Sequence, residues 1–344
     1  MNRIFDRKII LEDGTEFYGY GFGAKRDALV ELVFNTSMVG YQEILSDPSY
    51  TAQAVVMTYP LIGNYGMCNE DYETDRPTIS GLVVREFNSE PSNFRAARTL
   101  EDVMIQYDIV GIAGVDTRRL ARHIRDEGTC KALIVDAQTP SIACLAKMRS
   151  TALPTNQVSV VSTKSPWISA CANPKHRVVA VDCGIKHNII RSLNARGCEV
   201  TIVPWTVTVE EVMAMHPDGL FISNGPGKLP IFGICLGHQI IALAYGASTY
   251  KLKFGHRGGN HPVKNLQTGK VEITSQNHSY AVKADSLAGT GLTVTHVNLL
   301  DGTVEGQKCA ADRIFSVQYH PESAPGPQDS AYLFDEFIAM MEGK

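Results

Sequence analysis

The sequence predicts two domains, an N-terminal α+β domain over residues 1–140 and a C-terminal α/β domain with a doubly wound sheet over residues 177–344. Three observations lead to this prediction. The 344 residues are enough for two hydrophobic cores. Proline, serine, threonine and asparagine gather in residues 141–176, as is typical of a linker region. From Arg177 onward apolar strand patterns alternate with helical ones, which indicates a parallel sheet with helices on both faces.

The composition indicates a soluble globular protein, with 44% hydrophobic and 20% charged residues. A net charge of −4 provides no general attraction to nucleic acid or to an anionic membrane. The sequence has no apolar run of membrane-spanning length, and its first residues lack the apolar core of a signal peptide. The eight cysteines form no C-x-x-C pair, which fits a reducing compartment. We therefore expect a cytoplasmic protein without a metal, nucleic-acid or membrane partner.

The first domain begins with a predicted hairpin, because Asp13 and Gly14 form a strong two-residue turn signal. Thr99 and Asp116 have the side chains of helix N-caps, and Gly128 has the character of a helix stop. The further elements that we expect here are strands at 29–34, 54–58 and 79–84 and helices at 100–107 and 117–125. The mixture, without an internal repeat, predicts a compact α+β unit.

Two features of the first domain resemble binding motifs but have ordinary explanations. The glycines within residues 19–23 do not have the spacing of a dinucleotide-binding loop, and no predicted helix follows them. Four arginines on the second predicted helix could bind an anion, although a solvated helix face is the commoner meaning of such a pattern. These arginines are Arg118, Arg119, Arg122 and Arg125.

The second domain has four predicted strands before its central motif. We expect strands at 178–181, 200–203, 220–223 and 230–234, helices at 188–193 and 209–215, and later strands at 248–253, 269–273, 292–297 and 314–317 before a last helix at 328–341. Only residues 224–229 separate the third strand from the fourth, whereas a parallel crossover needs about a dozen residues. Either these strands are not parallel neighbours, or the chain lacks residues between about Gly227 and Leu229. We favour the second explanation.

Residues 233–237 read Gly-Ile-Cys-Leu-Gly, which is the spacing of a nucleophile elbow with cysteine as the nucleophile. A strand that turns directly into a helix forces the middle residue into a strained conformation, and glycine on both sides removes side chains that would clash. The helix would place its positive end at Cys235, which favours the thiolate. A buried, inert core thiol is the alternative interpretation. One face of the predicted helix carries Leu236, Ile240, Leu243 and Ala244, and Gly246 has the character of its stop.

A cysteine nucleophile needs a base, and a third group that orients the base is an advantage. His320 follows the predicted strand 314–317, at a strand end where functional residues gather in this architecture. Glu322 comes two residues later, and a carboxylate can fix the tautomer of an imidazole and stabilise its charged form. The sequence therefore predicts a catalytic triad of Cys235, His320 and Glu322.

These motifs resemble the class I, or triad, glutamine amidotransferases through residues 233–239 and 320–322. More of the chain is similar to one member family, the small, glutamine-hydrolysing subunit of carbamoyl phosphate synthetase. The segments that carry this second resemblance are 223–227, 254–263 and 276–278 in the second half and 35–38, 40–45, 47–50 and 116–118 in the first. The resemblance implies that the C-terminal sheet has the amidotransferase type and that the N-terminal domain is specific to this subunit.

The resemblance also implies a mechanism. Cys235 would attack the side-chain amide of glutamine, His320 would protonate the departing ammonia, and Glu322 would hold His320. A glutamyl thioester would form and water would hydrolyse it, with backbone N–H groups near Gly227 and at Leu236 as an oxyanion hole. The residues that the resemblance places around glutamine are Ser49, Gly225, Gly227, Leu236, Gln239, Asn277, Ser279 and Tyr280.

The chain departs from the family pattern at two places. The family has glycine and then phenylalanine or tyrosine after its Asn-His pair, whereas Ser279 precedes Tyr280 here. The Asp-Pro that normally follows Gly-Pro-Gly is absent, together with the next helix. If this shortening is real, a catalytically impaired docking subunit is an alternative function. We expect His256, His261 and His278 to be structural hydrogen-bonding residues rather than catalysts.

The sequence has no glycine-rich phosphate-binding loop, so we expect no ATP, bicarbonate or magnesium site on this chain. The resemblance implies a large synthetase subunit that binds ATP and magnesium and consumes the ammonia, in a heterodimer or a larger assembly. Its product, carbamoyl phosphate, would serve pyrimidine and arginine synthesis. A different triad amidotransferase is the other enzyme that the motifs allow.

Overall fold

The structure is a computed structural model that describes residues 4–221 and 229–343. The chain forms two compact units, Met1–Gln157 and Val158–Lys344. The division between them lies inside the range 141–176 that is predicted to be a linker region. In the described residues no helix is both long enough and apolar enough to cross a membrane.

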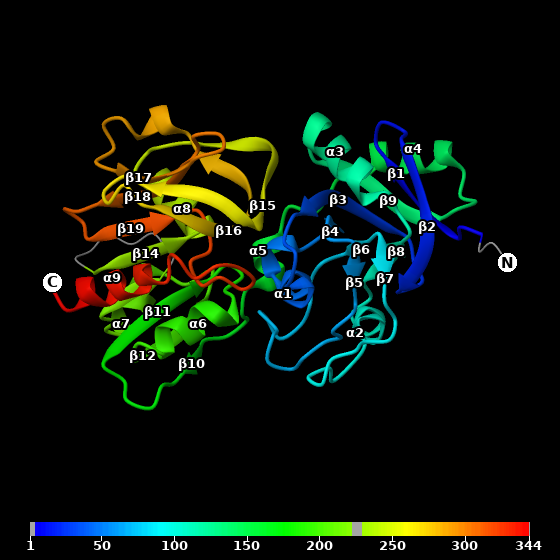
Figure 1. The fold of residues 1–344 in the computed structure, drawn as a ribbon. Helices are drawn as coiled ribbons and strands as arrows, with labels where there is room; N and C mark the ends of the chain where they lie inside the picture. The colour runs from blue at the N-terminus through cyan, green and yellow to red at the C-terminus, as the bar shows by residue number, and fades with distance from the viewer. Residues whose placement is uncertain (1–3, 222–228, 344) are drawn as a thin grey trace. The chain divides into compact units, whose positions relative to one another are not determined.

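Unit 1 is built on a closed barrel with the strand order β1-β2-β8-β6-β4-β3-β9 (Figure 1). The barrel strands are β1 (Arg7–Leu11), β2 (Glu16–Gly23), β3 (Ala28–Asn35), β4 (Gln53–Met57), β6 (Gly81–Val83), β8 (Val110–Ala113) and β9 (Cys130–Asp136). The remaining elements up to residue 150 are α1 (Tyr41–Ser46), η1 (Pro48–Tyr50), β5 (Leu61–Ile62), β7 (Glu86–Phe87), α2 (Leu100–Gln106), α3 (Thr117–Glu127) and α4 (Ser141–Ser150). The predicted mixture of helices and strands is therefore present.

The two helices predicted from their caps begin where the caps indicate. The Asp102 backbone N–H donates to Thr99 Oγ1 at 3.1 Å, and the Arg119 N–H donates to Asp116 Oδ1 at 2.9 Å. Gly128 ends α3 with a φ of 105°, which glycine adopts easily. These contacts satisfy N–H groups that the first turn of a helix leaves without a partner inside the helix.

The glycine-rich residues 19–23 lie in strand β2. Gly19 shows why glycine is needed there, because a Cβ atom would lie 2.4 Å from the backbone oxygen of Ala113 on the neighbouring strand β8. The glycines thus allow a close approach of strands, and no helix follows them, as expected from the sequence.

The range 141–176 contains regular structure. It includes α4, α5 (Gln157–Val161) and β10 (Trp167–Ser169). Cys144 and Met148 of α4 are buried against Ile10 and Leu133 of the barrel. The first part of this range therefore contributes to the hydrophobic core of unit 1.

Unit 2 contains a ten-stranded sheet in the order β10-β12-β11-β13-β14-β19-β18-β16-β15-β17 (Figure 1). The strands after β10 are β11 (His176–Asp182), β12 (Cys198–Pro204), β13 (Gly219–Phe221), β14 (Ile231–Ile234), β15 (Thr249–Asn265), β16 (Val271–Val282), β17 (Thr293–Asn298), β18 (Val304–Cys309) and β19 (Ile314–Val317). The five strands from β12 to β19 in this order are parallel, and the others pair antiparallel.

Helices cover both faces of the parallel strands. Helices α6 (His187–Asn194) and α9 (Tyr332–Met341) share one core with Val178 and Ala180 of β11. Helices α7 (Val209–Ala214) and α8 (Leu236–Ala244) share the other core with Val179 and Val181. Alternate residues of a strand point to opposite faces, so one apolar strand supplies both cores. This arrangement is the doubly wound sheet that the sequence predicts.

Strands β13 and β14 are parallel neighbours, with Leu220 opposite Ile231 and Phe221 opposite Phe232. The first explanation of the short interval, that these strands are not neighbours, is therefore wrong. Gly225, Gly227 and the interval itself lie outside the described residues.

Unit 2 differs from the sequence predictions in several details, including strand β18, which was not predicted. The buried side of α8 includes His238, Ile241 and Ala242, whereas Leu243 is 52% exposed and Ala244 is also exposed. The apolar side chains of α8 lie on all sides of the helix, so their spacing does not identify the buried face. Strands β15 and β16 are also much longer than predicted, because their polar residues pair in an antiparallel ribbon rather than alternating with apolar ones.

Candidate active site

Cys235 lies between β14 and α8 and has a φ of 53° and a ψ of −102°, a conformation that is strained for a residue with a side chain. Its backbone N–H donates to the Val317 oxygen at 2.9 Å, which ties the turn to β19. A Cβ atom at Gly233 would lie 2.6 Å from Ile241 Cδ1 and 3.0 Å from the Gly237 carbonyl carbon. The local geometry is thus the sharp strand-to-helix turn of the predicted elbow.

His320 follows β19, which pairs with β14 in the parallel sheet with Ile234 opposite Val317. The two strands therefore bring Cys235 and His320 to the same edge of the sheet. The His320 backbone N–H donates to the Ser275 oxygen at 2.9 Å and anchors this segment to β16. Parallel strands whose carboxyl ends meet in this way are a common position for an active site.

The His320 side chain is positioned by Glu322. Its Nδ1 atom lies 2.7 Å from Glu322 Oε1, and both side chains are buried. The Nε2 atom has no hydrogen-bond partner among the described residues, so it is available for a proton transfer. Burial and Lys186 oppose the charged imidazolium, but the Glu322 carboxylate and the Cys235 side chain outweigh them and raise the pKa of His320.

Lys186 was not predicted from the sequence. Its Nζ atom lies 2.7 Å from Glu322 Oε1, and its side chain is 3% exposed. Asn188 adds a hydrogen bond from its side-chain amide to the Glu322 backbone oxygen. Both residues come just after β11, at the same carboxyl edge as Cys235. Their position after the carboxyl end of β11 is the sequence signal that identifies them, because functional residues gather at strand ends in this architecture.

The turn before Lys186 is held by a single carboxylate. Asp182 Oδ1 accepts the backbone N–H groups of Gly184 and Ile185, each at 2.8 Å. Its Oδ2 atom accepts the Thr163 N–H at 2.7 Å. These bonds fix the chain between β11 and α6 and thereby the position of Lys186.

Four of the residues predicted to contact glutamine lie near Cys235 or are linked to one another. The Cys235 Sγ atom lies 3.7 Å from the Asn277 backbone oxygen. Gln239 donates its side-chain amide to the Tyr280 backbone oxygen at 3.0 Å and to Gln318 Oε1 at 2.9 Å. Leu236 begins α8 directly after the nucleophile. Asn277, Gln239, Tyr280 and Leu236 thus belong to the surroundings of the elbow, although their contacts with glutamine remain predictions.

Of the other residues predicted to contact glutamine, the structure describes Ser279 and Ser49. Ser279 has a hydrogen bond from the Arg257 guanidinium to its hydroxyl group. Ser49 lies in η1 of unit 1, where its N–H donates to Asp47 Oδ1 at 2.8 Å. Its role as a contact of glutamine bound in unit 2 stays a prediction, as do the roles of Gly225 and Gly227 outside the described residues.

His256, His278 and Glu305 form a buried group whose ligand atoms all lie within 4.8 Å of one another, and such a group could hold a metal ion. The side chains already have protein partners. His256 Nε2 lies 2.8 Å from Asp301 Oδ2, and its Nδ1 lies 3.4 Å from Glu305 Oε1. His278 contacts the Tyr280 backbone oxygen and the Gln276 side chain at 2.7 and 2.9 Å. Burial disfavours the charged form of His256, but Asp301 and Glu305 raise its pKa to about 9. The His256 imidazolium therefore gives these two carboxylates a positively charged partner without a metal ion.

Two family models together match most of the chain. The model of the carbamoyl-phosphate synthase small chain, CPSase domain, matches residues 9–134. The model of the class-I glutamine amidotransferase matches residues 179–229 and 227–340. The second match is broken at the short interval, as expected if the chain lacks residues there that other members have.

The chain is also similar to curated proteins over nearly its whole length. It is 52% identical over 353 residues to the carbamoyl phosphate synthase small chain of Staphylococcus haemolyticus, which covers 98% of this chain and 96% of that one. It is 51% identical over 352 residues to the protein of the same name from Fusobacterium nucleatum, with 97% and 98% covered, and to that from Bacillus caldolyticus, with 97% and 96% covered. These alignments are longer than the 344-residue chain, so they contain positions at which the relatives have a residue and this chain has a gap. The chain belongs to the carbamoyl phosphate synthase small chain family, and its second half is a class-I glutamine amidotransferase domain.

Proposed function

We propose that this chain hydrolyses glutamine to glutamate and ammonia at Cys235 and delivers the ammonia to a large synthetase subunit, which makes carbamoyl phosphate. The observation that carries the proposal is the position of Cys235 in a strained elbow beside a buried imidazole that is held by a carboxylate. Family membership supports the same reaction and implies the large-subunit partner.

The geometry supports a cysteine mechanism. His320 accepts the proton of the Cys235 thiol, and its raised pKa favours the imidazolium that holds this proton. The thiolate sulfur attacks the side-chain carbonyl carbon of glutamine, and the carbon–nitrogen bond breaks as His320 gives its proton to the departing ammonia. Water then attacks the glutamyl thioester, His320 accepts a proton from the water, and the thiolate leaves. The N–H of Leu236, at the start of α8, would stabilise the oxyanion in both steps.

The large subunit would supply the binding sites for ATP and magnesium, which this chain is not expected to have. We infer that ATP and magnesium bind to the large subunit and that the two subunits form a heterodimer or a larger assembly of heterodimers in the cytoplasm. We expect no cofactor, nucleic acid or membrane to bind this chain. Carbamoyl phosphate would enter pyrimidine and arginine synthesis, as the family implies.

The test is to mix the purified chain with the large subunit of carbamoyl phosphate synthase and to measure carbamoyl phosphate formed from glutamine and from ammonium. Cys235→Ala should abolish glutamine-driven synthesis, by roughly 10³-fold or more, and leave ammonium-driven synthesis intact. Cys171→Ala is the matched control, because Cys171 is a partly exposed thiol outside the proposed site. Equal glutamine-driven synthesis with Cys235→Ala would show that the elbow is not the site of reaction.

The short interval before Leu229 favours a second candidate function, a docking subunit with impaired catalysis. The test compares the chain with a variant that carries a family-length segment between Gly227 and Leu229. If only the lengthened chain hydrolyses glutamine while both bind the large subunit, the second function holds. Activity of both chains supports the first. A third possibility, a different triad amidotransferase, would be indicated by glutaminase activity that does not respond to the large subunit.

A further inference from the structure

Helix α3 of unit 1 carries five basic side chains, and three of them have partners. The Arg119 guanidinium lies over the Phe17 ring, 5.1 Å from its centroid. His123 Nε2 lies 3.1 Å from Asp13 Oδ2. Arg125 forms an ion pair at 2.8 Å with its neighbour Asp126. These three side chains are explained by contacts within the unit.

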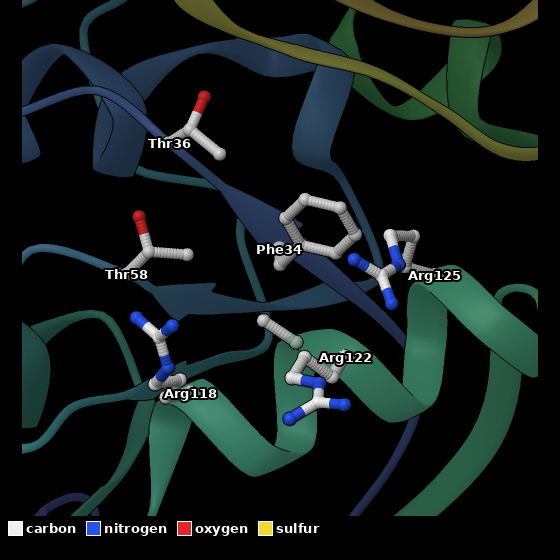
Figure 2. A pocket seen from close by; sticks show the side chains of 7 residues that line it. Phe34, Thr36, Thr58, Arg118, Arg122 and Arg125 are labelled. Atoms are coloured by element: carbon white, nitrogen blue, oxygen red, sulfur yellow. The ribbon is translucent and has the colours of Figure 1, made fainter.

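Arg118 and Arg122 are different. Both are exposed, and neither guanidinium has a hydrogen bond or an ion pair within residues 4–221 and 229–343. Their spacing of four residues puts them on one face of α3. Both line a hollow of about 510 Å³ whose other walls include Phe34, Thr36 and Thr58 (Figure 2). Two positive charges without an ion pair in the described residues therefore border the same recess, and Asp116 and Asp126 line a neighbouring hollow with them.

The loop that continues from this recess carries two exposed apolar side chains. After Thr36 and Ser37, the side chains of Met38 and Val39 are 72% and 68% exposed. Met38 and Val39 come two and three residues after Thr36, which lines the recess. Exposed apolar side chains that accompany charges without an ion pair are typical of a protein interface, where the apolar groups are covered and the charges lie at the rim. A site for a small anion gives no reason for the two apolar residues to be exposed. The combination thus favours a protein partner over a free anion.

We propose that the Arg118–Arg122 face of α3, together with Met38 and Val39, is a docking surface for an acidic region of the synthetase partner. This inference rests on the proposed function, which requires such a partner. Guanidinium groups bind carboxylates in a bidentate manner and lose little hydration in doing so, which suits them to a protein interface. Carboxylates of the partner would neutralise the two arginines, and its surface would cover the two apolar side chains.

The experiment measures the affinity of the chain for the purified large subunit at low and at high salt. The double variant Arg118→Glu/Arg122→Glu should weaken binding by roughly tenfold or more at low salt, and the difference should shrink at high salt. Met38→Asp should weaken binding at both salt concentrations, since it interrupts the apolar part. Arg149→Glu is the matched control, an exposed arginine in the last turn of α4 in the same unit.

Without the large subunit, the glutaminase activity of all these variants should equal that of the wild type. Equal activity would show that the variants fold. It would also separate the docking surface from the proposed function, because hydrolysis would be intact while binding is weakened. Unchanged affinity of the double variant would overturn the docking surface even if glutamine hydrolysis is established. Inorganic phosphate, used as a probe, should compete no better than chloride at equal ionic strength. Selective competition by phosphate would overturn the inference in favour of a small-anion site.

Discussion

The Nζ atom of Lys186 lies 2.7 Å from Oε1 of Glu322, and the same oxygen lies 2.7 Å from Nδ1 of His320. One buried carboxylate oxygen is therefore shared by two cationic groups. Burial alone would raise the pKa of Glu322, but Lys186 and His320 together lower it to about 2. Glu322 consequently stays ionised at neutral pH, and Lys186 and Glu322 act on the charge of His320 in opposite directions.

The first prediction concerns Glu322→Gln. The charge that favours the His320 imidazolium is removed, so the pKa of His320 should fall and the imidazolium should lose its proton at a lower pH. We expect the alkaline limb of kcat/KM for glutamine to move to lower pH by about one unit or more, with kcat reduced roughly tenfold to hundredfold. The pH profile of glutamine hydrolysis measures both effects. A profile that keeps its alkaline limb would contradict the role of Glu322.

The second prediction concerns Lys186→Met, which should move the alkaline limb of the pH profile in the opposite direction to Glu322→Gln. Lys186 disfavours the charged form of His320, so its removal should raise the pKa of His320 and move the alkaline limb to higher pH. Lys186 also lowers the pKa of Glu322, so without it Glu322 should accept a proton at a higher pH and activity should begin to fall earlier on the acid side. Lys253→Met, which changes an exposed lysine in β15, should leave the profile unchanged. Movement of the alkaline limb in the same direction as for Glu322→Gln would refute this electrostatic account.

The sequence predicted Cys235, His320 and Glu322 because each lies in a short local motif, the elbow at residues 233–237 or the His-Pro-Glu at residues 320–322. The role of Lys186 was not predicted, because Lys186 and Glu322 are 136 positions apart in the sequence and only the fold brings them into contact. No local sequence pattern indicates that contact. The elements with a strong period or a cap, such as α2, α3 and β11, were predicted to within a few residues. Strand β18 was missed and β15 was predicted too short, because the polar residues of this part of the sheet are held by pairing and by buried hydrogen bonds.

The third prediction concerns the buried cluster around His256. Its pKa is raised, so the stabilisation from its charged form is complete below its unfolded pKa near 6.5 and is lost as the pH rises through about 9. Each pKa unit corresponds to about 1.4 kcal/mol, so the loss should be on the order of a few kcal/mol. Urea unfolding at pH 6 to 10 should show this decline in the wild type and a flatter curve in His256→Gln. An exposed histidine, His216, provides the control variant His216→Asn. Equal slopes for wild type and His256→Gln would contradict the prediction.

The last prediction tests the steric cause of the elbow with Gly233→Ala. The added Cβ atom would lie 2.6 Å from Ile241 Cδ1 and 3.1 Å from the Gly237 backbone oxygen, so α8 must shift away from β14. We expect the free energy of unfolding to fall by about 1–3 kcal/mol and glutamine hydrolysis to fall further, because Cys235 and the Leu236 N–H move with the start of α8.

A double variant separates the two contacts. Ile241→Val removes the Cδ1 atom, so Gly233→Ala/Ile241→Val should be less destabilised than the sum of the single variants. Its activity should nevertheless remain low, because the backbone of Gly237 cannot be trimmed and still displaces the helix. Thermal unfolding and glutaminase assays of the three variants make this comparison. Activity that returns with the stability would mean that Ile241 packing, rather than the turn at Gly233, positions Cys235.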